Sequence, residues 1–182
     1  MTKPPAQENV EEVKKLLITG TPGIGKTTLM KTIARILKPF HPVGFYTEEI
    51  REQGTRVGFQ LVSLDGWVSL MSHVNIQGPF RVGKYGVDVE GFERFLDSLP
   101  FMDPATSYVV IDEIGKMECQ SKQFQRLVMA ILDQDKICIA TIALHGMGFI
   151  ENIKRRPDIT LFTMDSRNRD SLASTLLRAV RR

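Results

Sequence analysis

The sequence predicts a three-layer α/β domain with a mostly parallel β-sheet and a β-rich antiparallel insertion after the first helix. Short apolar runs alternate with segments of helical periodicity, as in βα units. Between residues 43 and 72 the pattern changes to short β-rich segments separated by glycine-bearing turns. With 182 residues, 42% of them hydrophobic, the chain can bury one sizeable core. We therefore expect residues 13–182 to form a single domain, preceded by a flexible tail at residues 1–12.

The first half of the chain contains one βα unit and then the insertion. A buried strand is expected over residues 14–20, and a helix over residues 25–38 that ends before Pro39. Turns are expected at Gln53-Gly54 and Asp65-Gly66. The insertion comprises extended segments at residues 43–50, 56–64 and 67–72.

The second half returns to alternating helices and strands, as a three-layer arrangement requires. Buried strands alternate there with helices, and the chain ends in a helix that begins near Arg169. In order, the expected elements are a helix over 89–99, a strand over 107–115, a helix over 122–133, a strand over 136–144, a short helix over 149–155, a strand over 159–164 and the C-terminal helix.

A glycine-rich sequence lies where the first strand becomes the first helix. Gly20, Gly25, Lys26 and Thr27 satisfy the pattern G-x-x-x-x-G-K-[ST], in the strand–loop–helix context that the pattern requires. Glycines allow the backbone N–H groups to converge on an anion, and the positive end of the helix favours negative charge there. A simple Gly-Pro turn would not need the Gly-Lys-Thr order. We therefore predict a phosphate-binding loop in which Lys26 reaches the β- and γ-phosphates and Thr27 binds Mg²⁺.

Two acidic residues follow the second buried strand of the βα pattern. Tyr108 to Ile111 are apolar or aromatic and lead directly into Asp112 and Glu113. In open α/β sheets ligands bind beyond the carboxyl ends of the strands, where the phosphate loop also lies. We therefore predict that Asp112 holds Mg²⁺ and that Glu113 orients and deprotonates a water molecule in line with the γ-phosphate.

Four sequences, in this order and at this spacing, carry a family resemblance. They are "GTPGIGKTT", "VGFYTEEIR", "RVGKYGVDV" and "VVIDEIGKME". With them the chain resembles the THEP1-type nucleoside triphosphatases, a family that includes the human cancer-related nucleoside triphosphatase, over nearly all of its length after the tail.

The resemblance implies a P-loop NTPase fold and Mg²⁺-dependent hydrolysis of ATP, GTP and other NTPs to NDP and phosphate, with broad base selectivity. Lys26 and Glu113 would be catalytic, and Thr27 and Asp112 would bind the metal. Two segments would contact the nucleotide, namely Gly20, Thr21, Pro22, Gly23, Ile24, Gly25, Lys26, Thr27 and Thr28, and Val109, Val110, Ile111, Asp112, Glu113, Ile114, Gly115 and Lys116.

Other charged residues have two readings each. Glu48 and Glu49 end a predicted strand, where one of them faces either the metal or the solvent, because alternation puts them on opposite faces. Arg81 is a candidate arginine finger, with Lys84 as a second cation in the same loop, or both are solvated loop charges. Lys116 covers the phosphates or pairs with Glu118.

Alternative functions share the phosphate loop. A nucleotide or small-molecule kinase would need an acceptor site, and a nucleotide-binding switch module would need no more than the binding residues. A regulatory GTPase would be expected to carry an [NT]-K-x-D segment, which the sequence lacks. A carboxylate next to the metal-binding acid favours water activation, so hydrolysis is the preferred function.

Composition limits the other partners. A net charge of +3 is too small to indicate nucleic acid, and no apolar run is long enough for a membrane span. Two distant cysteines and three scattered histidines indicate neither a disulfide framework nor a further metal site. We expect a cytoplasmic protein whose partners are nucleoside triphosphates, with a monomer favoured although the sequence leaves the oligomeric state open.

Overall fold

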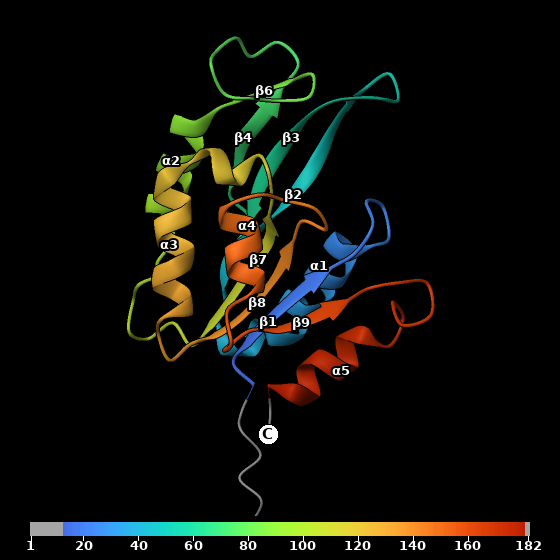
Figure 1. The fold of residues 1–182 in the computed structure, drawn as a ribbon. Coiled ribbons are helices and arrows are strands. Elements are labelled where there is room, and N and C mark those ends of the chain that lie inside the picture. Colours follow the sequence, from blue (N-terminus) through green and yellow to red (C-terminus); the bar gives the residue numbers. More distant parts are fainter. Residues whose placement is uncertain (1–12, 181–182) are drawn as a thin grey trace, which may run out of the picture.

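The computed structural model describes residues 13–180, and the helices and strands follow in the predicted order (Figure 1). The predicted tail, residues 1–12, lies outside the described residues. The elements are β1 (Lys15–Thr19), α1 (Lys26–Leu37), the 3₁₀ turn η1 (Lys38–Phe40), β2 (Val43–Glu52), β3 (Thr55–Ser63), β4 (Val68–His73), β5 (Arg81–Val82), β6 (Tyr85–Val87), α2 (Val89–Asp97), β7 (Tyr108–Ile114), the 3₁₀ turn η2 (Glu118–Gln120), α3 (Lys122–Leu132), β8 (Ile137–Ile142), α4 (Phe149–Lys154), β9 (Thr160–Thr163) and α5 (Leu172–Ala179).

The nine strands found in residues 13–180 belong to one mixed sheet. Its order is β5-β6-β4-β3-β2-β7-β8-β1-β9. The strands β2, β7, β8, β1 and β9 pair in parallel, whereas β3 to β6 form an antiparallel extension on β2. Figure 1 shows this extension, coloured cyan to green, rising above the parallel part. The predicted α/β architecture with its antiparallel insertion is confirmed.

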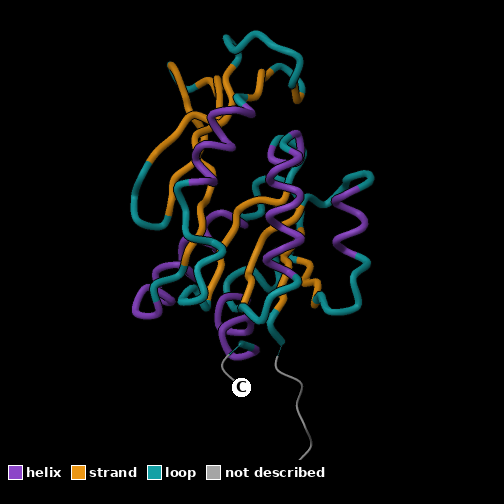
Figure 2. Tube along the Cα trace, turned by 90° about the vertical axis from the view of Figure 1, so that its left-hand side faces the viewer, coloured by secondary structure: helices purple, strands orange, loops and turns teal. Residues whose placement is uncertain are grey.

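Helices cover both faces of the parallel part, so the sheet has a core on each side. Figure 2 shows the sheet edge-on between helices. On one face, α1 and α5 pack their apolar residues against Leu16 and Ile18 of β1. On the other face, apolar residues of α2, α3 and α4 form a second core cluster, to which β1 contributes Leu17. This alternation along β1 is the period-2 pattern of a strand buried on both faces.

One predicted boundary is wrong: the C-terminal helix begins at Leu172 rather than near Arg169. The preceding residues form turns in which side chains bind backbone N–H groups. The Asp165 carboxylate accepts from the N–H groups of Arg167 and Asn168, at 2.8 and 3.2 Å. Such local bonds compete with a helix, which is why the helical turn starts later.

Lys15, the first residue of β1, is buried where the parallel strands begin, beneath the segment that leads from α3 to β8. The Lys15 ammonium donates to the carbonyl oxygens of Ile131, Gln134 and Lys136 at 3.2, 2.7 and 2.5 Å. The side chain is buried, which lowers the pKa of Lys15, although nearby Asp158 and Asp135 oppose this shift. Lys15 therefore ties β1 to the end of α3. No helix in residues 13–180 is long and apolar enough to cross a bilayer.

Replacing Lys15 should destabilise the fold without touching the carboxyl edge of the sheet. Lys15→Met removes three donated hydrogen bonds and leaves buried carbonyl groups without partners, so the free energy of unfolding should fall by about 2–4 kcal/mol. Urea denaturation measures this. The matched control is Lys122→Met, an exposed lysine of α3, which should change stability by less than about 0.5 kcal/mol. Equal stability of the two variants would contradict the assignment.

Candidate active site

The loop between β1 and α1 depends on glycine for conformation and for space. Gly23 and Gly25 have φ angles of 78° and 112°, which residues with side chains rarely adopt. A β-carbon on Gly20 would lie 2.7 Å from the carbonyl oxygen of Met164, which follows β9. The loop therefore lies directly against the chain at the end of β9, and Met164 helps to shape it.

The first turn of α1 offers backbone donors to a ligand. The Leu29 N–H donates to the Gly25 carbonyl at 2.9 Å, and this is the first backbone hydrogen bond of α1. Within the described residues the N–H groups of Lys26, Thr27 and Thr28 have no backbone acceptor. Free N–H groups and the positive end of the helix dipole together form an anion-binding site.

Lys26 connects the loop with the end of β7. Its ammonium donates to the Gly20 carbonyl at 3.0 Å and lies 3.8 Å from Glu113 Oε2. Only 10% of the Lys26 side chain is exposed. The Lys26 ammonium therefore lies at the phosphate loop, and a phosphate oxygen can replace the Gly20 carbonyl as its partner.

Asp112 is buried between two threonine hydroxyl groups. Thr27 Oγ1 donates to Asp112 Oδ2 at 2.6 Å, and Thr141 Oγ1 donates to Oδ1 at 2.5 Å. Burial raises the pKa of Asp112, whereas the two hydroxyl donors and the nearby Lys26 and Lys31 cations lower it. The predicted meeting of Thr27 and Asp112 is therefore present in the structure.

Sequence reasoning missed Thr141. Strand β8 lies between β1 and β7, so its carboxyl end lies between the strand that leads into the phosphate loop and the strand that carries the acidic pair. Thr141 is the only hydroxyl residue of the otherwise apolar strand β8, "ICIATI". A hydroxyl near the carboxyl end of an apolar strand is a signal that would have identified it, because buried hydroxyl groups need partners.

Glu113 also faces the phosphate loop, beside Asp112. Consecutive strand residues normally point to opposite faces, but the pairing of β7 with β8 shifts register between Ile111 and Ile114. Glu113 consequently reaches Lys26 while Asp112 reaches Thr27. Burial raises the pKa of Glu113, Lys26 lowers it and Asp112 raises it.

The donor set at Thr27 and Asp112 suits magnesium bound together with phosphates. A hydroxyl and a carboxylate are oxygen donors, and Mg²⁺ in nucleotide sites is held by one or two such groups, by substrate phosphates and by water. Within residues 13–180, no group of three or more His, Cys, Asp or Glu side chains is placed to hold a metal ion without other ligands. The residues fit a metal that arrives with its substrate.

The remaining residues of the predicted second segment are of two kinds. Val109, Val110, Ile111 and Ile114 are core residues, each at most 1% exposed. Lys116 is exposed and Glu118 is buried, and no ion pair joins them among the described residues. Nucleotide contacts from this segment stay a prediction.

Glu48 and Glu49 lie on opposite faces of β2, as alternation predicts. Glu48 pairs with Lys31 of α1 at 2.5 Å, so it is on the α1 face. Glu49 pairs with Arg51 and Arg56 at 2.5 and 2.8 Å. Only Glu48 is therefore connected to the helix that carries the phosphate loop.

The arginine-finger candidate is bound to its own turn. The Arg81 guanidinium donates to the Lys84 carbonyl at 3.0 Å and to the Ile76 carbonyl at 3.4 Å. The Lys84 ammonium lies over the Tyr85 ring, 5.4 Å from its centroid. The structure brings neither cation to the phosphate loop.

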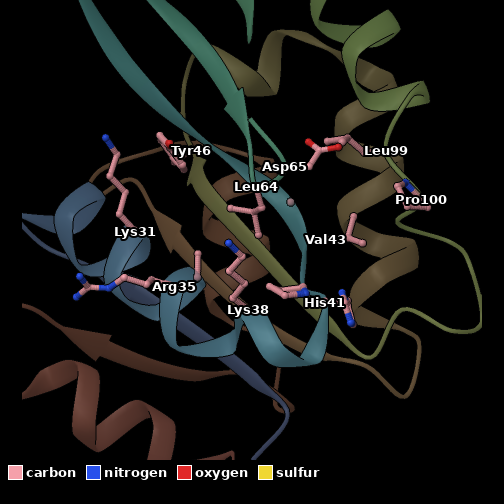
Figure 3. Close-up of a pocket in the computed structure, with 13 residues that line it drawn as sticks. Lys31, Arg35, Lys38, His41, Val43, Tyr46, Leu64, Asp65, Leu99 and Pro100 are labelled. Atoms are coloured by element: carbon pink, nitrogen blue, oxygen red, sulfur yellow. The ribbon is translucent and has the colours of Figure 1, made fainter. Parts of the chain in front are cut away.

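A cavity of about 590 Å³ lies beside α1, and Figure 3 shows the side chains that line it. Lys31, Arg35 and Lys38 supply cations, and Leu64 and Pro100 supply apolar surface. None of the predicted nucleotide-binding residues lines this cavity. Its size suits a small organic molecule, and it is separate from the phosphate loop.

Thr141 should contribute more than an ordinary buried threonine. Thr141→Val keeps the side-chain shape but removes a donor to a buried carboxylate, so the free energy of unfolding should fall by about 1.5–3 kcal/mol. The matched control is Thr106→Val, because buried Thr106 donates to the neutral Pro100 carbonyl at 2.9 Å, a bond expected to contribute about 0.5–1.5 kcal/mol. Urea denaturation of the two variants and the wild type measures both losses in the free energy of unfolding. A smaller loss for Thr141→Val than for the control would contradict the arrangement at Asp112.

Comparisons with known proteins identify the family of the chain. A family model described as NTPase matches residues 15–177. Nucleoside-triphosphatase THEP1 of Thermotoga sp. (strain RQ2) is 42% identical over 164 residues, which are 90% of this chain and 93% of that protein. The crystal structure of THEP1 from Aquifex aeolicus has a TM-score of 0.77 and 33% identity, over 92% of this chain and 99% of that one. The solution structure of a human cancer-related nucleoside triphosphatase has a TM-score of 0.79 and 34% identity, over 92% and 97%. The chain therefore belongs to the NTPase family that includes THEP1 and the human cancer-related nucleoside triphosphatase.

Proposed function

We propose that this protein hydrolyses nucleoside triphosphates to nucleoside diphosphate and phosphate, with Mg²⁺ and with little selectivity for the base. The observation that carries the proposal is the position of Glu113, whose Oε2 lies 3.8 Å from the Lys26 ammonium of the phosphate loop. A carboxylate beside the γ-phosphate site is placed to activate water. Family membership and the names of the relatives support the same activity.

The loop and the first turn of α1 bind the triphosphate. The free N–H groups of Lys26, Thr27 and Thr28 donate to phosphate oxygens, and the Lys26 ammonium exchanges the Gly20 carbonyl for the β- and γ-phosphates. Thr27 and Asp112 would hold Mg²⁺, which would offset phosphate charge. Thr141 keeps the Asp112 carboxylate in the orientation that faces Thr27.

Glu113 is the general base in this mechanism. Its carboxylate accepts a proton from water as the water oxygen attacks the γ-phosphorus, and the bond to the leaving diphosphate breaks. Burial raises the pKa of Glu113, which makes it a better base, while Lys26 opposes this rise. Only 29% of the Glu113 side chain is exposed, so few other water molecules compete for it.

We propose broad base selectivity because the residues expected to bind the substrate contact its phosphates and not its base. The residues in place at the carboxyl edge of the sheet bind phosphate and metal, and the sequence has no [NT]-K-x-D segment for guanine. Residues 13–182 would perform the whole reaction as one domain.

A kinase is the second candidate, and the cavity beside α1 is the observation that favours it. The cavity begins at Lys31, one helical turn beyond Thr27, and it is large enough for an acceptor. Hydrolysis is preferred because Glu113 is already at the phosphate loop. The experiment that tests the function is phosphate release from ATP with and without Mg²⁺; NDP formed without free phosphate, and only in the presence of an acceptor, would favour the kinase.

Glu113 and Asp112 should be separable by mutation. Glu113→Gln removes the base but not the metal ligands, so single-turnover hydrolysis should slow by about 10²–10⁴-fold. The affinity for Mg·ATP should change by less than about tenfold. Asp112→Asn should weaken binding and Mg²⁺ dependence together, because Asp112 would hold the metal that offsets the charge of the bound phosphates.

Two further variants control this comparison. Glu49 lies on the face of β2 that points away from α1 and the phosphate loop, so Glu49→Gln should hydrolyse ATP like the wild type. Lys26→Ala should lose both binding and turnover. Wild-type hydrolysis by Glu113→Gln would assign the base elsewhere, with Glu48 the next candidate.

Base selectivity is tested with the natural triphosphates. The values of kcat/KM for ATP, GTP, CTP and UTP should lie within about tenfold of each other, which corresponds to about 1.4 kcal/mol. Steady-state phosphate release at saturating Mg²⁺ gives these values. A preference of several hundredfold for one base would reveal a base pocket that the proposal lacks.

A further inference from the structure

Glu118 is a buried carboxyl group that the proposed mechanism does not use. It lies in η2, a short turn that follows β7, and it is 6% exposed. The backbone N–H groups of Gly115 and of Glu118 itself are its hydrogen-bond donors. No Lys, Arg or His side chain of the described residues forms an ion pair with it. An ionised carboxylate in such a site is costly, so a neutral carboxyl is the favoured form.

Glu118 and Glu113 meet at Gly115. The point where a β-carbon on Gly115 would lie is 2.7 Å from Glu118 Oε2 and 3.2 Å from Glu113 Oε1. The other Glu113 oxygen, Oε2, is the one that faces Lys26. The two oxygens of Glu113 are thus divided between the phosphate loop and the side on which Glu118 is buried.

We propose that Glu118 is a positioning residue for Glu113: its neutral carboxyl donates a hydrogen bond to Glu113 Oε1 and keeps Oε2 directed at the phosphate loop. The inference rests on the proposed function, because Glu113 must be the base. Glu118 keeps its proton throughout and touches neither substrate nor metal. A second carboxylate in this place would instead repel Glu113.

The charges around Glu118 favour the neutral form. Asp112 and Glu113 approach from β7, and both are acidic. Packed against the turn are α2, which brings Glu93 to Ser121, and α3, which begins at Lys122. Cys119, in the same turn, has a pKa raised to about 12 and is neutral. Burial and then Glu113 raise the pKa of Glu118 to about 8.

The pH dependence follows from that direction. Below about pH 8 Glu118 is neutral and donates to Glu113; above it the proton is lost and two carboxylates face each other. Wild-type kcat should therefore fall as the pH rises past about 8. Glu118→Gln retains a donor that does not titrate, so kcat should stay near the wild-type value at pH 7 and this alkaline fall should disappear.

The experiment measures kcat and KM for Mg·ATP from pH 6 to 9.5 in the full-length wild type, Glu118→Gln and Glu118→Leu. The leucine variant lacks the donor, so kcat should be about 10- to 100-fold lower with KM changed by less than about threefold. Glu93→Gln is the control, since it alters a carboxylate near the same turn that binds Ser121 and not Gly115. Its alkaline fall should match that of the wild type.

Two further measurements separate positioning from a purely structural contribution. In a Glu113→Gln background, Glu118→Leu should lower kcat no further, because its effect acts through Glu113. Urea denaturation of Glu118→Gln and the wild type should show the variant gaining relative stability between pH 5 and 8. The folded wild type retains a proton there that its unfolded chain has lost, and it loses stability as the pH rises.

Each result decides the inference. An alkaline fall of kcat that persists in Glu118→Gln, or a wild-type kcat in folded Glu118→Leu, overturns it. If Glu118→Leu does not fold, the pH profile of Glu118→Gln still decides. Failure of the proposed function gives a different result: Glu113→Gln would then hydrolyse ATP like the wild type, whatever Glu118 does.

Discussion

The site depends on one buried carboxylate, Asp112, which receives hydrogen bonds from two different elements of the fold. Thr27 approaches from α1 and Thr141 from β8, so three segments that are distant in sequence are fixed around one side chain. The bonds are possible because β8 is inserted between β1 and β7, with the carboxyl ends of all three parallel strands at one edge. Loss of either donor would leave part of a buried carboxylate unsatisfied. The hydrogen bonds that fix Asp112 in the site therefore require this order of strands in the sheet.

The fold could be predicted from the sequence because its signals are local. Period-2 and period-3.6 patterns gave the strands and helices in the right order, and turns such as Gln53-Gly54 marked the antiparallel insertion. The late start of α5 was not predicted, because Asp165 and Asn168 bind backbone groups in a way that residue periodicity does not reveal. Sequence also gives no strand order, so the place of β8 between β1 and β7 had to come from the structure.

The same division applies to the site. Gly20, Gly25, Lys26 and Thr27 form a contiguous motif, and their meeting with the acidic pair followed from the rule that ligands bind at the carboxyl ends of strands. Thr141 was missed because its partner is 29 residues away and depends on strand order. Pairing with Glu118 was one of the two alternatives for Lys116, because the two side chains have opposite charges and are two residues apart. In the structure Glu118 is buried in η2 and Lys116 is exposed. The burial of Glu118 and the contact of Thr141 depend on how distant segments pack, which a local pattern of residues does not reveal.

Buried polar groups at the two edges of the sheet differ in how they are satisfied. At the amino-terminal edge, Lys15 and Lys136 donate to backbone carbonyl groups, which are fixed partners of the fold. At the carboxyl edge, Lys26 has a carbonyl and a carboxylate at 3.0 and 3.8 Å, and the N–H groups beside it have no backbone acceptor in the described chain. Groups of the first kind stabilise the protein without a ligand. Groups of the second kind have no fixed partner in the fold other than these two, and they can bond to an anion instead, so anion binding should rigidify this edge and leave the other unchanged.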